Sequence, residues 1–155
     1  MGLDIEEQDT TQGHVRVIRQ NNVISEYLNS LDITPNPTIQ CPMPEAKPLW
    51  SDDEALDEAD TTWYRSQIGS LNYFAMTTRY AIAHAVSRLS QCAAKPTRGS
   101  HTALVRVLKY LVNHPTHNLI GKRSYKDKLS VYSDSDHASD RPHTMKSHTG
   151  CLITS

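Results

Sequence analysis

The chain has 155 residues, which corresponds to one domain or to two small parts of domains. Hydrophobic residues make up 37% of it and the mean hydropathy is −0.55, and no stretch approaches the roughly 20 apolar residues that cross a bilayer. The three cysteines lie far apart without a CxxC pair, which argues against a disulfide scaffold. Since no basic-then-apolar leader follows Met1, we expect an intracellular protein, in cytoplasm or nucleus, without a membrane partner.

Charge is divided along the chain. Residues 1–60 carry thirteen acidic and three basic side chains, whereas residues 61–155 carry four acidic and thirteen basic ones. Ten of these basic residues lie between Arg65 and Lys126, where no acidic residue occurs. A stretch of one sign can build a positive surface, and the commonest extended partner of such a surface is a phosphate backbone. A solvated basic face is the alternative, and charge alone does not separate the two.

The N-terminal part predicts a strand and a helix. Apolar and polar residues alternate from His14 to Val17 and Ile18 follows, which predicts a short strand over about 14–18 after a turn at Gly13. Helical spacing then predicts an amphipathic helix over about 20–31, with its apolar side formed by Ile24, Tyr27, Leu28 and Leu31.

A region that disfavours regular structure follows the first helix. Five prolines stand between Pro35 and Pro48, and an acidic run extends from Asp52 to Asp60. Proline lacks an N–H and fixes φ, so helix and central strand are both disfavoured. We therefore predict a long exposed connection over about 33–61.

The second part is predicted to be helical and then to form strands. A helix capped by Thr61 or Thr62, a second over about 79–92 and a third over about 98–113 each carry an apolar stripe. The expected buried residues are Tyr64, Ile68, Leu71, Ala75, Ile82, Ala85, Val86, Leu89, Leu104, Val107, Leu108 and Leu111. Strand-like segments follow at about 118–123, 129–133 and 149–154, where we expect unpaired edges because sheet partners are missing. This order gives an α+β class.

The strand-like segment that ends near Asp134 is the most informative for chemistry. Its apolar residues alternate, and Asp136 follows two positions later on the same face if the strand continues. Carboxylates in this setting suit Mg²⁺, and two such ions can hold an in-line phosphoryl displacement. Carboxylates from other elements would have to complete such a site. Ser-Asp-Ser-Asp is also good turn chemistry, and the residues alone favour that reading.

Two other groups of residues give weaker signals. Asp52 and Asp53 are similar to the paired aspartates of a polymerase palm, but an acidic loop explains them better. Three histidines and Cys151 near the C-terminus could bind zinc, but their spacing fits no standard pattern.

Residues 64–79, YRSQIGSLNYFAMTTR, resemble the block YRSxxGSLxYLAxxTRPD of Ty/copia-type retrotransposon Pol polyproteins. The stretch AHAVSRLSQ at 83–91 resembles AYAVSRLSQ, and RVLKYL at 106–111 resembles RVLRYL in the same order. VYSDSD at 131–136 with KSHTG at 146–150 resembles the blocks YSDADWAGD and RKSTSG. The sequence departs from the pattern at Tyr80-Ala81, Ser100-His101 and His137, where Pro-Asp, His-Trp and Trp are usual.

The resemblance implies a place for each part of the chain. Residues 1–18 would be the end of a reverse transcriptase palm, with a strand or hairpin remnant. Residues 19–113 would be the thumb and connection, a helical bundle that holds the template–primer duplex. Residues 118–155 would open an incomplete ribonuclease H-like sheet, and the first metal-binding and catalytic carboxylate would be Asp134.

The resulting expectation is a fragment of a Pol polyprotein whose parent performs RNA-directed DNA synthesis and RNA–DNA hybrid cleavage with Mg²⁺. Alone the chain is expected to be inactive, to bind no metal tightly and to bind RNA–DNA or DNA duplexes without sequence preference, with the rest of the polyprotein as a further partner. From charge and helical placement, the nucleic-acid-binding residues would be Arg65, Arg79, Arg88, Arg98, Arg106 and Lys109. A recruited protein-interaction module and a degenerate remnant without function are the alternatives.

Overall fold

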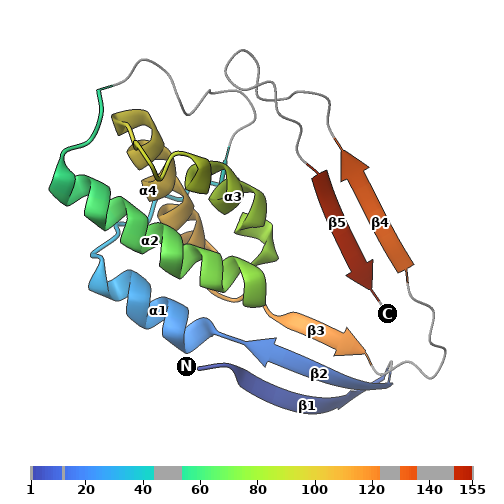
Figure 1. Cartoon of the computed structure of the whole chain (residues 1–155). Coiled ribbons are helices and arrows are strands. Elements are labelled where there is room, and N and C mark those ends of the chain that lie inside the picture. The colour runs from blue at the N-terminus through green and yellow to red at the C-terminus, as the bar shows by residue number, and fades with distance from the viewer. Residues whose placement is uncertain (1, 12, 44–53, 123–129, 136–148, 155) are drawn as a thin grey trace.

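The computed structural model describes residues 2–11, 13–43, 54–122, 130–135 and 149–154, and it confirms the α+β class. In Figure 1 the helices form one group, the strands β1, β2 and β3 extend from it, and β4 and β5 form a separate hairpin. The elements are β1 (Asp4–Thr10), β2 (Gly13–Arg19), α1 (Asn21–Ser30), α2 (Glu58–Thr77), the 3-10 helix η1 (Tyr80–Ile82), α3 (Ala83–Gln91), α4 (Arg98–Asn113), β3 (Leu119–Lys122), β4 (Ser130–Ser135) and β5 (Thr149–Thr154). None of the described helices is both long and apolar enough to span a bilayer.

The first sheet brings together the strand that precedes the first helix, β2, and the strand that follows the last helix, β3. The strands lie in the order β1-β2-β3, and Val17 of β2 pairs with Glu6 on one side and Ile120 on the other. Gly13 turns the hairpin at a φ of +107°, a conformation that side chains of L-residues rarely adopt. After residue 118, β3 pairs with β2 and β4 pairs with β5, and each of these strands has a neighbour on one side only within the described residues, so the expected unpaired edges are present.

Opposite charges face each other across the β1–β2 hairpin. Arg16 forms an ion pair with Glu7 at 2.6 Å, and Arg19 forms one with Glu6. His14 lies 2.9 Å from Asp9 and 3.4 Å from Glu7. The hydrogen bond to Asp9 is the main reason why the pKa of His14 lies above its usual value.

Replacing Asp9 with asparagine is expected to lower the pKa of His14, because the main group that favours the imidazolium loses its charge. A raised pKa means that protonated His14 stabilises the hairpin below the usual histidine pKa, and that this contribution is lost as pH rises through the raised value. An NMR titration of the His14 ring measures the shift. Asp4→Asn, at the other end of β1, is the control, and an equal effect of both changes would contradict the assignment.

The observed helices bury the apolar stripes as predicted, but two of them begin at other residues than predicted. Helix α4 has the predicted bounds and a capping box between Thr97 and Ser100. Helix α2 begins earlier than predicted, because Asp57 accepts a bond from the backbone N–H of Asp60 at 2.8 Å. The second predicted helix begins as the 3-10 turn η1 and becomes α-helical only at Ala83, because the backbone at Arg79 lies outside the helical region.

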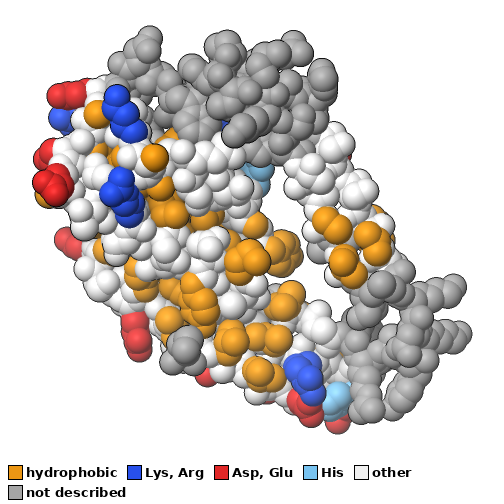
Figure 2. Space-filling view, in the orientation of Figure 1, with side chains coloured by type: hydrophobic (Ala, Val, Ile, Leu, Met, Phe, Trp, Pro, Cys, Tyr) orange, Lys and Arg blue, Asp and Glu red, His pale blue; other side chains and the backbone are white. Residues whose placement is uncertain are grey.

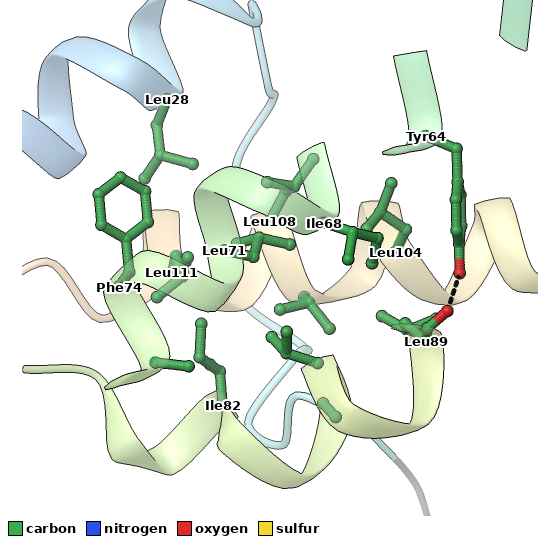
Figure 3. Packing of buried hydrophobic residues seen from close by; sticks show 14 of the residues in the cluster. Leu28, Tyr64, Ile68, Leu71, Phe74, Ile82, Leu89, Leu104, Leu108 and Leu111 are labelled. Atoms are coloured by element: carbon green, nitrogen blue, oxygen red, sulfur yellow. Dashed lines mark hydrogen bonds between the residues drawn. The ribbon is translucent and has the colours of Figure 1, made fainter. Parts of the chain in front are cut away.

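The core lies between the four helices, and the residues expected from the stripes are buried there, which confirms the stripes (Figure 3). Leu71 of α2 and the α4 residues Leu104 and Leu108 are completely inaccessible to solvent. The hydroxyl of Tyr64 donates to the backbone oxygen of Leu89 at 2.8 Å and ties α2 to α3. Helix α1 adds Ile24 and Leu28 to the same core.

The predicted exposed connection is bound to the helical part at both of its described ends. Asn113 donates to the backbone oxygens of Asn36 and Ile39 at 2.6 and 3.1 Å, and Ile39 is buried. At the far end, the N–H of Leu56 donates to the oxygen of Pro96 at 3.0 Å. The connection is therefore attached to the helical part at Asn36, Ile39 and Leu56, and most of its other described residues are exposed. Residues 44–53, with Asp52 and Asp53, lie outside the described part.

Candidate nucleic-acid interface

Two of the predicted phosphate-binding residues lie at the end of the helical group where α2 begins. The Nε and Nη2 of Arg65 donate to the backbone oxygens of Ala93 and Ala94, between α3 and α4, at 2.8 and 3.0 Å. Arg98 at the start of α4 forms an ion pair with Glu54 at 2.8 Å, although its side chain is 71% exposed. Both guanidinium groups keep further N–H donors for other partners.

Acidic residues accompany the basic ones at this end. The hydrogen bond that Arg98 donates to Glu54 is the main cause that raises the pKa of Arg98, and the charges of Asp60 and Asp57 act in the same direction. Figure 2 shows basic and acidic side chains close together over the part of the surface where α2 begins. Acidic residues of the N-terminal part of the sequence therefore lie next to basic residues of the C-terminal part in the folded chain.

Three more predicted residues lie on α3 and α4 and are partly buried: Arg88, Arg106 and Lys109. The Nε of Arg106 donates to the backbone oxygen of Cys41 at 3.2 Å, so this arginine helps to hold residues 36–41 against α4. Lys109 forms no ion pair within the described residues.

Arg79 lies inside the molecule, contrary to what its charge suggests, and only 3% of it is exposed. Its guanidinium donates to the oxygens of His114, Pro115 and Asn21 at 3.1, 2.5 and 3.1 Å. Burial is the main cause that lowers its pKa. Arg79 therefore joins the ends of α2 and α4 to the start of α1, and its burial excludes it from an exposed basic face.

A buried glutamine next to Arg79 was missed by the sequence analysis. The Oε1 of Gln20 accepts from the hydroxyls of Thr77 and Thr78 at 2.5 and 2.6 Å. These residues are 57 and 58 positions away from Gln20, and no local pattern connects them. The polar residues at the junction of β2 and α1 are thus part of the packing between hairpin and helices.

The predicted metal ligand Asp134 is exposed on β4, where it pairs with Gly150 of β5. Within the described ranges, no three histidine, cysteine or acidic side chains come together as a metal site. Asp136 and the histidines at 137, 143 and 148 lie outside these ranges. The described residues, with Asp134 as an isolated carboxylate, do not fit a Mg²⁺ site.

Comparison with known proteins identifies several similar sequences, although no protein-family model and no solved structure matches the chain. Retrovirus-related Pol polyproteins from the Arabidopsis thaliana transposons RE1 and RE2 are 38% and 44% identical over 113 and 81 residues. These matches cover 73% and 52% of the chain but only 7% and 6% of the two polyproteins.

Two further relatives extend the comparison. Putative transposon Ty5-1 protein YCL074W of Saccharomyces cerevisiae is 28% identical over 99% of the chain and 48% of its own length. A secreted RxLR effector protein of Plasmopara viticola is 42% identical over 50% of the chain and 54% of its own length. The chain thus spans less than two thirds of each relative. The two polyproteins and the Ty5-1 protein relate this chain to a segment of retrotransposon Pol polyproteins.

Proposed function

We propose that the chain is the thumb and the beginning of the ribonuclease H part of a Ty/copia-type Pol polyprotein, and that its helical part contacts the phosphates of an RNA–DNA or DNA duplex without sequence preference. The similarity to the RE1 and RE2 polyproteins is the observation that carries this proposal. The acid-free stretch from Arg65 to Lys126 supports it, because sequence-independent duplex binding depends on Lys and Arg.

The surface available for phosphates is smaller than the sequence indicates. Arg79 is buried, so the assignment is to Arg65, Arg88, Arg98, Arg106 and Lys109. Glu54 competes with phosphate for Arg98, whereas Lys109 has no ion pair in the described part of the chain. We therefore expect Lys109 to contribute more to duplex binding than Arg98.

The parent polyprotein would synthesise DNA on RNA and cleave RNA–DNA hybrids. In our proposal the parts follow the order palm end (1–18), thumb and connection (19–113) and ribonuclease H start (from 118), with Asp134 as the first ribonuclease H carboxylate. Mg²⁺ would supply the charge stabilisation of phosphoryl transfer once carboxylates from other parts of a polyprotein join Asp134. The chain alone would perform neither reaction.

Salt dependence tests the binding proposal. If about four phosphates are contacted, the logarithm of the association constant should fall with the logarithm of salt concentration at a slope of roughly −3.6. Fluorescence anisotropy with a labelled RNA–DNA hybrid measures this slope. Lys109→Gln should reduce its magnitude by about 0.9, because one phosphate contact is lost.

Arg16→Gln is the matched control, since it removes the same charge from β2, outside the acid-free stretch, and should leave the slope unchanged. A flat salt dependence, or no binding at low salt, would refute the phosphate interface. A recruited protein-interaction module is the alternative. A specific protein partner retained at high salt, without duplex binding, would favour that alternative.

A further inference from the structure

The β4–β5 hairpin does not pair with the other strands of the described chain. It forms a two-stranded sheet of its own, separate from the sheet of β1, β2 and β3 (Figure 1). Val131 of β4 pairs with Ile153 of β5, and these residues are 59% and 61% exposed. An isolated two-stranded sheet is at best marginally stable in water, and three or more strands are needed for independent stability. The hairpin would therefore gain stability from a strand that pairs with one of its edges.

The outer edge of β5 differs from the other free strand edges because it carries no charge. The strand reads TGCLIT, six residues without a charged side chain or a proline. By contrast, β1 contains four acidic residues, β3 ends at Lys122 and β4 contains Asp134. Charged side chains on an edge strand oppose pairing with a second chain. Among the free edges of the described strands, β5 is the one without this protection.

A second copy of β5 fits this edge in antiparallel orientation. When a two-fold axis relates two such strands, one residue lies opposite its own copy and the others pair symmetrically around it. With Leu152 at the centre, Cys151 lies opposite Ile153 of the other copy, so two exposed apolar residues become neighbours. No like charges meet in this register, and the formal net charge of −1 adds little repulsion between whole chains.

We propose that two copies of this chain associate through the outer edges of their β5 strands, in the register centred on Leu152. The product is a continuous four-stranded antiparallel sheet in the order β4-β5-β5-β4, which exceeds the minimum for independent stability. Because the pairing uses both β5 edges, the assembly closes at two copies, and Asp134 on β4 opposes the addition of further strands. The interface is small, so the association is weak. It does not depend on the proposed duplex binding.

Sedimentation equilibrium of the full chain, from low micromolar to millimolar concentration, tests the association. We expect a monomer–dimer equilibrium. Ile153→Lys should raise the dissociation constant about tenfold, because two symmetry-related apolar pairs are lost and each edge gains a lysine.

Val131→Lys is the matched control for this change. It alters the residue that pairs with Ile153, at nearly equal exposure, and so removes the same contact within the hairpin, but it lies on the outer strand. It should leave the dissociation constant unchanged. A chain that stays monomeric at millimolar concentration, equal effects of the two variants, or growth beyond two copies would each overturn the proposal.

Oxidation by diamide tests the register, in chains that carry Cys41→Ser so that Cys151 is the one exposed native thiol. Ile153→Cys places a thiol opposite Cys151 of the other copy, at the Cα separation of about 4.5–5.5 Å that paired strands share and that a disulfide can span. Diamide is reduced as each pair of thiols is oxidised, and non-reducing electrophoresis should show a covalent dimer. Val131→Cys should not crosslink, because β5 separates it from the other copy. A covalent dimer without either change would place Cys151 opposite its own copy and overturn the register.

Discussion

Replacing Leu104 with alanine is expected to lower the free energy of unfolding by about 2–5 kcal/mol. Leu104 lies in the middle of α4, has 0% exposure and belongs to the core shared by the helices. Removing three carbons there loses their transfer free energy and leaves a cavity that the packed neighbours fill only in part. Since small proteins have a total stability of roughly 5–15 kcal/mol, this is a large share. Urea unfolding monitored by circular dichroism measures the change.

Met76→Ala is the control for this prediction. Met76 lies on α2 with 77% exposure, so its truncation removes apolar atoms that already contact water. We expect a change within about 0.5 kcal/mol. If both variants unfold at the same urea concentration, the helices do not form the packed core seen in Figure 3.

The helical part of the fold could be predicted because its information is local. Apolar residues at helical spacing identify the buried side of each helix, and Leu104, Leu108 and Leu111 are buried as this pattern predicts. A helix start is harder to predict where several residues can cap: Asp57 and Thr61 are both good caps, and only the fold selects Asp57. The observed bounds of α4 agree with the predicted ones, because Thr97 follows a proline and is the one clear capping residue there.

The strand pairing and the ion pairs could not be predicted, because they depend on residues that lie far apart in the sequence. The pairing of β3 with β2 joins segments about a hundred residues apart, and alternation within one strand does not identify its neighbour. The ion pair between Glu54 and Arg98 crosses the charge boundary on which the predicted basic face was based. Charge composition describes a surface only if the charged residues stay on it and remain unpaired, and Arg79 does not meet the first condition.

Replacing Arg79 with methionine is expected to lower the free energy of unfolding by about 3 kcal/mol, because three acceptors lose a charged donor. The oxygens concerned belong to His114, Pro115 and Asn21, which connect the end of α4 to the start of α1. Methionine fills much of the same space, so the loss measures hydrogen bonding more than packing. We also expect faster amide hydrogen exchange in residues 114–122, because the chain segment leading to β3 loses its attachment. Urea unfolding and exchange followed by NMR measure both effects.

Arg65→Met is the control that shows whether the effect of Arg79→Met depends on the burial of its hydrogen bonds. Arg65 also donates to two backbone oxygens, but it is exposed, so water can replace both bonds. We expect it to cost no more than about 1 kcal/mol. The desolvation penalty of the buried charge acts in the opposite direction, because Arg79→Met removes that penalty from the folded state. If Arg79→Met is as stable as the natural chain, the desolvation penalty equals the contribution of the three hydrogen bonds, and Arg79 would not stabilise the connection between the end of α4 and the start of α1.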